Sequence, residues 1–264
     1  MADAADVARW QRWRAARAAG LSAPDSWLGV VGLFWLEEGA NTVGSDPSAA
    51  VVLTVGPAVL GRIDCTGTTA VWRPVLGAPV PLQTDAGGAP TMIEHGALAF
   101  FVIERDGRLA ARVRDRDWAA RRPFAGIDAF AYDPAWRIEA DWRPLDPPQT
   151  IEVPDAGGDF RPATVAWQAV FRVGDAEVSL LPMRVAGDGV FFVFRDATSG
   201  RTTYGAGRFL DAAPASGGRI VLDFNFACNP PCAFTSFATC PLPPPQNRLP
   251  FSVDAGELRY AGGH

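Results

Sequence analysis

The sequence has 264 residues, enough for one large β domain or two small ones with a substantial buried core. Hydrophobic residues make up 48% and charged residues 20% of the chain, which excludes a disordered protein. The net charge is −5, and no basic stripe compensates for it locally. Nucleic-acid binding is therefore not expected, because it requires a surplus of basic side chains on one face.

The sequence contains few of the residue types that commonly act in catalysis. Every basic side chain is an arginine, and the absence of lysine excludes Schiff-base chemistry and a P-loop lysine. The two histidines are His95 and His264, so a catalytic triad would have to use His95. No histidine-rich metal motif can be written with them. We expect no metal site, and the sequence does not identify a cofactor.

Residues 1–26 are expected to hold an N-terminal amphipathic helix over residues 3–19. Val7, Trp10 and Trp13 share one face of it, and Gly20 is a natural stop. This face is expected to pack on the β body as a brace. Four arginines interrupt the apolar residues, so the segment is not read as a signal peptide: Arg9, Arg12, Arg14 and Arg17. With no run of 18 apolar residues elsewhere, we expect a cytoplasmic protein that does not contact membranes.

After the helix the pattern changes to period 2, with turn residues between short runs. Asp106-Gly107 and Gly174-Asp175 are expected to be hairpin turns. The predicted strands cover residues 98–104, 109–113, 164–173, 178–181, 190–195, 201–210 and 219–227. Many short strands joined by hairpins indicate a mainly β protein whose body is an antiparallel sandwich or barrel.

Two proline-rich segments organise the chain. Residues 143–162 are the expected connection between a first β half, residues 27–142, and a second, residues 163–264, within one continuous globular unit. Residues 241–250 are expected to be extended in polyproline II geometry and docked on the fold or on a partner.

The chain resembles, nearly end to end, the bacterial domain of unknown function 1684 family. Blocks that carry the resemblance are residues 194–200 (FRDATSG), 203–209 (TYGAGRF), 223–225 (DFN), 229–234 (NPPCAF), 240–244 (CPLPP), 247–249 (NRL) and 255–257 (AGE). Further matches near the start and middle are residues 32–36, 44–47, 114–115, Trp118 and Pro123. Cys228 departs from the family pattern, which usually shows tyrosine. The resemblance supports the fold and implies no activity.

The opening strands of the first half also resemble those of forkhead-associated phosphopeptide-binding sandwiches, over residues 41–53 with Gly61 and Arg62. Ser45 stands where that family has an arginine. Without this charge a phosphothreonine site loses its main anchor.

A group of polar side chains follows the predicted strands of the second half. Strand alternation places Asp223 and Asn225 on one face of residues 219–227, and Tyr204 shares a face with Arg208. If these faces point inward, a polar pocket forms, and its expected ligand-binding residues are Arg195, Tyr204, Arg208, Asn225 and Arg248. The alternative is a structural Asp–Arg pair with capping amides, because a buried carboxylate must be paired.

Three residues are candidates for catalysis. Asp223 and Glu257 would form a carboxylate pair for general acid–base chemistry, unless Glu257 is an exposed residue at the end of a strand. Cys232 is a candidate nucleophile if its pKa is lowered. Cys232 and Cys240 also fit the pattern of small buried residues in a tight proline loop.

Two functions remain open. In the first, the pocket binds a small anionic ligand through its arginines, and the protein is either a binding protein or a hydrolase-like enzyme. In the second, the chain is a non-catalytic interaction or structural module, and a homo-oligomer is compatible with both. A metal-dependent or thiol enzyme is a third choice.

Overall fold

The computed structural model describes residues 3–122, 124–154 and 160–262. Pro123 and His264 lie outside the described residues. The chain divides into two compact units, Leu21–Phe124 and the combination of Met1–Gly20 with Ala125–His264. No helix in the described part is long and apolar enough to cross a membrane.

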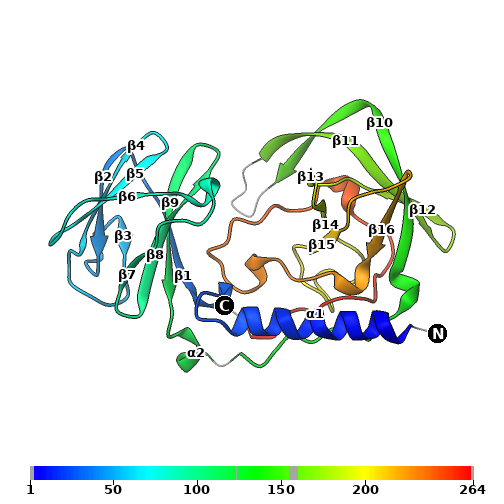
Figure 1. Ribbon diagram of the computed structural model, residues 1–264, viewed down its shortest axis with the longest axis horizontal. Coiled ribbons are helices and arrows are strands. Elements are labelled where there is room, and N and C mark those ends of the chain that lie inside the picture. Colours follow the sequence, from blue (N-terminus) through cyan, green and yellow to red (C-terminus); the bar gives the residue numbers. More distant parts are fainter. Residues whose placement is uncertain (1–2, 123, 155–159, 263–264) are drawn as a thin grey trace. The chain divides into compact units, whose positions relative to one another are not determined.

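The unit Leu21–Phe124 consists of two sheets (Figure 1). One has the strand order β1-β9-β8-β7 and the other the order β3-β2-β4-β5-β6. The strands are β1 (Val30–Trp35), β2 (Gly39–Gly44), β3 (Val51–Val52), β4 (Gly61–Thr66), β5 (Thr69–Pro74), β6 (Val80–Leu82), β7 (Ile93–His95), β8 (Leu98–Arg105) and β9 (Arg108–Asp115). Short helices are η1 (Trp27–Gly29), η2 (Asp85–Gly87) and α2 (Trp118–Arg121).

Alternating apolar residues explain why these two sheets pack as a sandwich. Ile63 and Trp72 from one sheet share a core with Phe100 and Val113 from the other. The rings of Trp72 and Phe100 meet edge to face, with centroids 5.1 Å apart. The predicted hairpin at residues 106–107 is confirmed, because β8 and β9 pair around two residues with positive φ, 53° and 72°.

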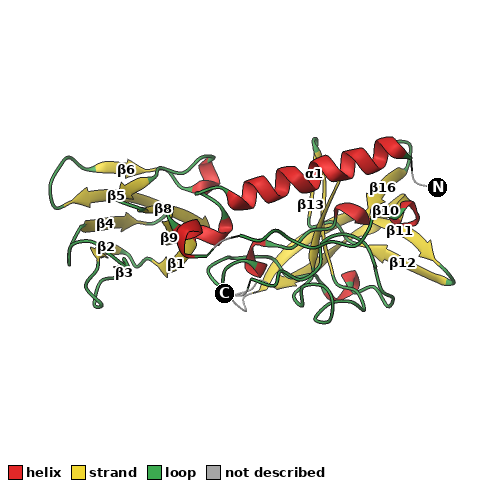
Figure 2. Cartoon of the chain, turned by 90° about the horizontal axis from the view of Figure 1, so that it is seen from below, coloured by secondary structure: helices red, strands yellow, loops and turns green. Residues whose placement is uncertain are grey.

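The second unit combines α1 (Ala4–Ser22) with two further sheets, of strand orders β12-β11-β10-β16 and β13-β14-β15. Its strands are β10 (Arg137–Pro154), β11 (Phe160–Val173), β12 (Ala176–Leu180), β13 (Arg184–Ala186), β14 (Gly189–Phe194), β15 (Arg208–Ala212) and β16 (Arg219–Asp223). Single 3₁₀ turns are η3 (Pro134–Trp136), η4 (Phe224–Phe226), η5 (Pro231–Ala233) and η6 (Pro245–Asn247). α1 is the long helix of Figure 2, and the other helices are short.

Phenylalanines fill the core of this unit. Phe192, Phe194 and Phe224 are fully buried, and Phe194 and Phe224 pack edge to face with centroids 5.2 Å apart. The core also takes apolar residues from β10, β11 and β16, so the two sheets enclose it together. The prediction of a mainly β, antiparallel, sandwich-like protein with an N-terminal helix is confirmed.

Three predicted segments differ from the structure. Residues 143–162, expected as a connection, belong mostly to the long β10–β11 hairpin, and residues 155–159 lie outside the described part. The strand predicted over 201–210 begins at Arg208, and the strand predicted over 219–227 ends at Asp223. Side-chain hydrogen bonds and prolines decide where these strands begin and end, and alternation of apolar residues does not take either into account.

The proline segment 241–250 docks on its own unit. Asn247 is fully buried, accepts from the Leu181 backbone N–H at 2.8 Å, and donates to the carbonyls of Leu181 and Val193, each at 2.8 Å. These three bonds tie the segment to β14 and to the end of β12.

Candidate functional site

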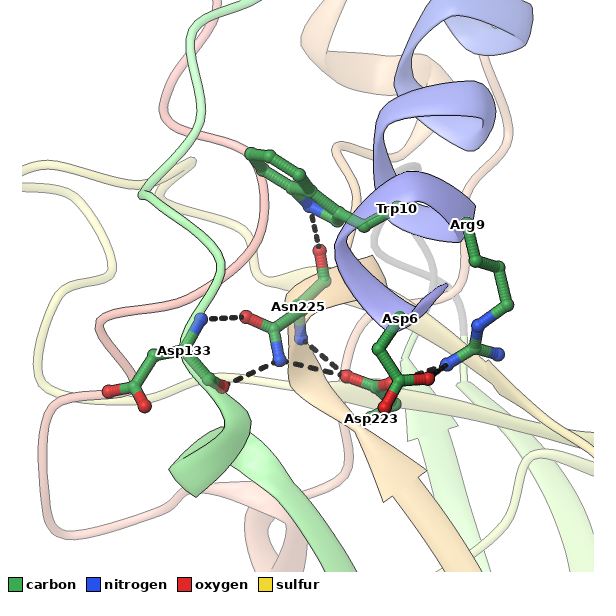
Figure 3. Close-up of polar contacts among 6 residues, drawn as sticks. All are labelled: Asp6, Arg9, Trp10, Asp133, Asp223 and Asn225. Carbon is green, nitrogen blue, oxygen red and sulfur yellow. Dashed lines mark hydrogen bonds and ion pairs between the residues drawn. The ribbon is translucent and has the colours of Figure 1, made fainter. Parts of the chain in front are cut away.

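The N-terminal helix is anchored on the end of β16 by a polar network (Figure 3). The Trp10 indole is 8% exposed and donates to the Asn225 carbonyl at 3.1 Å. From the preceding residue, the Arg9 guanidinium donates to the Asp223 carboxylate at 2.9 Å. The predicted packing of the helix tryptophans on the β body is therefore confirmed for Trp10, and also for Trp13, whose ring contacts Phe226.

Asp223 and Asn225 meet through a capping turn instead of sharing a strand face. Asp223 caps η4, accepting from the Asn225 backbone N–H at 3.3 Å and from its side-chain amide at 2.9 Å. The Asn225 amide also bonds both backbone groups of Asp133, at 2.9 Å each. With 1% of its surface exposed, Asn225 has no face left for a ligand.

A pocket of about 410 Å³ lies where α1 faces β15 and β16, and we call it the Asp223 pocket. Its lining combines four charged side chains with an aromatic wall and small residues: Arg9, Arg137, Asp211, Asp223, Trp13, Phe226, Val221, Ala212, Ala213 and Cys228. The Trp13 and Phe226 rings pack edge to face at 5.2 Å, and the Arg9 guanidinium lies 4.6 Å from the Phe226 centroid. The volume is in the range of small-molecule sites.

The four charges of the Asp223 pocket are not equally engaged. Asp223 is 8% exposed and is matched by Arg9. Arg137 is exposed and lies directly opposite Asp223 in the β10–β16 register. Among the described residues, neither Arg137 nor Asp211 has an ion-pair or side-chain hydrogen-bond partner. One cation and one anion in this pocket are therefore available to a ligand.

Glu257 lines a different pocket, so the expected pairing of Asp223 with Glu257 is wrong. This second pocket, about 360 Å³, lies beside the C-terminal half of α1 and residues 125–128. The Glu257 carboxylate is 3% exposed, pairs with both Nε and Nη2 of Arg17, and accepts from the Asn229 N–H at 2.6 Å. Its expected alternative, an exposed residue at the end of a strand, is also wrong.

Arg208, expected to bind a ligand, is enclosed within the protein. It has no exposed surface; it pairs with Asp196 at 2.7 Å and donates to the carbonyls of Val253, at 3.0 Å, and Ala255. Burial lowers the pKa of the Arg208 guanidinium, with Asp196 opposing that effect. Between the two interpretations of the sequence, a pocket residue or a structural Asp–Arg pair, Arg208 follows the second.

Two of the remaining candidate ligand-binding residues lie next to each other. Arg195 and Arg248 are bridged through their backbones: Arg195 N–H donates to the Asn247 carbonyl at 3.0 Å, and Leu249 N–H donates to the Arg195 carbonyl at 2.8 Å. Arg248 is exposed and Arg195 is half-buried. Arg248 belongs to the docked proline segment and Arg195 pairs with it, and neither lines the Asp223 pocket.

Tyr204 and Cys232 form a separate group. The half-buried Tyr204 hydroxyl donates to the Cys232 carbonyl at 2.8 Å. Cys232 is buried and its N–H donates to the sulfur of Cys240 at 3.2 Å. Cys228 lies apart from this group, in the wall of the Asp223 pocket, and burial raises the pKa of its thiol to about 12. That thiol stays protonated near neutral pH. No cluster of metal-ligating side chains is present in the described residues.

The available charges of the Asp223 pocket, Arg137 and Asp211, were not among the residues expected from the sequence. One signal pointed to the helix: Arg9, Trp13 and Arg17 are spaced by four residues and therefore share a helix face. Arg137 and Asp211 carry no local motif. Only the pairing of β10 with β16 and of β15 with its neighbours brings them to the pocket.

Comparison with known proteins supports a family and no activity. Residues 122–258 match the family model described as "Protein of unknown function (DUF1684)". The solution NMR structure of an uncharacterised protein of Haloarcula marismortui is 31% identical; the match covers 55% of this chain and 79% of that chain, with a TM-score of 0.43. No curated protein matches the chain.

Proposed function

Because the chain belongs to the DUF1684 family of proteins of unknown function, we propose a function from the site alone: the Asp223 pocket binds a small zwitterion with a flat apolar part, such as an aromatic amino acid. The observation that carries this proposal is the presence of two unmatched charges of opposite sign, Arg137 and Asp211, in one pocket of about 410 Å³. Arg137 would take the carboxylate and Asp211 the ammonium group.

The aromatic wall supports a flat ligand. Trp13 and Phe226 are half-buried, so each offers part of its ring to the pocket. Aromatic groups pack against such rings in offset or edge-to-face arrangements, which add roughly 0.5–1.5 kcal/mol to burial of their area. Arg9 already covers one part of Phe226 and neutralises Asp223. The ligand's charges are therefore left to Arg137 and Asp211.

Binding is favoured over hydrolysis because of how Asp223 is held. Its carboxylate accepts hydrogen bonds from Arg9 and twice from Asn225. These three hydrogen bonds fill most of the roughly four acceptor positions of the carboxylate, and they fix the turn that carries the pocket. We assign Asp223 the role of holding α1 and Arg9 in place, without proton transfer.

The proposal is tested with three matched probes: L-phenylalanine, 3-phenylpropanoate, which lacks the ammonium group, and 2-phenylethylamine, which lacks the carboxylate. Isothermal titration calorimetry on the full chain should show the tightest binding for phenylalanine. Arg137→Ala should weaken phenylalanine and 3-phenylpropanoate about tenfold, the value of one charge-assisted contact of about 1.4 kcal/mol. Asp211→Asn should weaken phenylalanine and 2-phenylethylamine and leave 3-phenylpropanoate unchanged.

Arg184→Ala is the matched control, because Arg184 is an exposed strand arginine that does not line this pocket. Equal losses in Arg184→Ala and Arg137→Ala would mean that net charge alone is being measured. Absence of binding by all three probes would reject the proposal. That outcome would favour the alternative, a non-catalytic interaction module.

A further inference from the structure

Three residues that are far apart in the sequence meet in a cluster outside the Asp223 pocket. Tyr204 comes from the loop before β15, Cys232 from η5 and Cys240 from the start of the proline segment. The Tyr204 hydroxyl donates to the Cys232 carbonyl at 2.8 Å, and the Cys232 N–H donates to the Cys240 sulfur at 3.2 Å. Both cysteines are buried, with 8% and 3% of their surfaces exposed.

The surroundings of Cys232 favour its thiolate. Its pKa is lowered, first by a hydrogen bond with the Cys240 side chain and, against the opposing effect of burial, by one with Tyr204. Burial raises the pKa of Tyr204, which therefore remains a protonated donor. Cys228 and Cys65 are the contrast within the same chain, since burial raises their pKa values to about 12 and about 11. A low thiol pKa combined with a neighbouring second thiol is typical of redox-active cysteines.

We propose that Cys232 and Cys240 form a two-cysteine site that is oxidised reversibly to a disulfide by small hydroperoxides. None of the four cysteines, all within the described residues, is in a disulfide here, so the structure corresponds to the reduced state. The 3.2 Å contact between the Cys232 N–H and the Cys240 sulfur makes the two residues direct neighbours, which a bridge between them requires. This site is independent of the function proposed for the Asp223 pocket.

The reaction balances in two steps. The Cys232 thiolate attacks one oxygen of the hydroperoxide: an S–O bond forms, the O–O bond breaks, and the leaving alkoxide takes up the thiol proton as an alcohol, or as water when the oxidant is hydrogen peroxide. Cys240 then attacks the sulfenic sulfur: the S–S bond forms, the S–O bond breaks, and hydroxide leaves as water with the second thiol proton. A dithiol reductant reverses the change by thiol–disulfide exchange.

The test treats the reduced full-length protein with hydrogen peroxide and follows intact mass. The expected result is a loss of 2 Da that dithiothreitol reverses. Trypsin releases residues 220–248 as one peptide containing three cysteines, so the bridge must be located with chymotrypsin, which cleaves after Phe234 and Phe237 between Cys232 and Cys240. Cys228→Ser should behave like wild type. Cys240→Ser should stop at a Cys232 sulfenic acid that dimedone traps.

Tyr204→Phe separates an activated site from two thiols that are merely close together. Loss of the hydroxyl should raise the Cys232 pKa, slow oxidation roughly fivefold at pH 7, and move the pH–rate profile to higher pH, because only the thiolate reacts. A native protein that keeps all its thiols while its urea-unfolded form oxidises would overturn the proposal. A bridge to Cys228, or a pH profile identical in Tyr204→Phe, would do the same.

Discussion

The Arg208 guanidinium donates to three acceptors from two parts of the chain. Asp196 supplies a carboxylate, and residues 253 and 255 supply carbonyls from the segment that follows the proline region. A buried ion pair of this kind contributes little by its formation, because two charges lose their hydration. Loss of one partner is costly, however, since it leaves the other charge buried alone.

Arg208→Ala is therefore expected to lower the free energy of unfolding by about 3–5 kcal/mol, because Asp196 and two carbonyls lose their donor. Urea denaturation followed by circular dichroism measures this change. Arg219→Ala is the matched control: Arg219 also pairs with carboxylates, Glu139 and Asp141, but at an exposed position, so its midpoint should move little. Similar midpoints for the two variants would contradict the structural role of Arg208.

The buried polar residues show what could be predicted from the sequence and what could not. The sequence identified Asp223 and Asn225 as residues that must be hydrogen-bonded if buried, and it named Arg208 and Glu257 as candidate site residues; all four are buried and hydrogen-bonded. It did not identify their partners. Those partners lie at the other end of the chain in three cases: Arg9, Trp10 and Arg17, all on α1. Contacts over more than 200 residues leave no local pattern in the sequence.

At the level of elements, α1 is held by two arginines in different surroundings. Arg9 is half-exposed, with 51% of its side chain accessible, whereas Arg17 is 24% exposed and reaches Glu257, whose side chain is 4% exposed. Arg17 also donates to the Asn229 carbonyl at 2.7 Å and lies over the Phe234 ring. The helix is therefore attached more firmly near its C-terminal half than near its start.

Arg17→Ala is expected to lower the free energy of unfolding by about 3–5 kcal/mol, because Glu257 would remain as a buried carboxylate without its cation. Arg9→Ala should lower the free energy of unfolding by less, about 1–2 kcal/mol, because the buried Asp223 carboxylate keeps its two hydrogen bonds from Asn225. Chemical denaturation measures both values, and proteolysis of α1 in native buffer shows whether the helix has detached. Equal losses of unfolding free energy in the two variants would indicate that water reaches Glu257 despite its low exposure. The double variant Arg17→Ala, Glu257→Gln should recover part of the loss.

The elements themselves were largely predictable. Period-2 alternation located β8, β9, β11, β12, β14 and β16, because in each one face meets an apolar core. It failed for the β10–β11 hairpin, where prolines at residues 144, 147 and 148 suggested a linker. A register shift between Pro144 and Gln149 absorbs these prolines without ending the strand pairing. Such a shift depends on the partner strand and has no signal in β10 alone.

At the scale of the whole molecule, each compact unit has its own main core among the described residues. Phe100 belongs to the core of Leu21–Phe124, and Phe192 to the core of the other unit, which also holds the Asp223 pocket and the Tyr204–Cys232–Cys240 cluster. The sequence predicted one continuous unit with a division near residues 143–162. The compact units instead divide at residues 20–21 and 124–125, so the second unit is assembled from both ends of the chain. No local composition change marks such a discontinuous unit.

Two cores imply two cooperative transitions, because each unit buries its own apolar surface. Phe100→Ala and Phe192→Ala remove the same side chain from 2% and 0% exposed positions, and each should destabilise its own unit by about 3–5 kcal/mol. Hydrogen exchange with mass spectrometry distinguishes them: Phe100→Ala should reduce protection in peptides from residues 30–115 and leave those from residues 160–262 protected. Phe192→Ala should do the reverse, including the peptides of α1. Equal loss of protection throughout the chain in either variant would mean that the two cores unfold as one, and that stability cannot be assigned to the units separately.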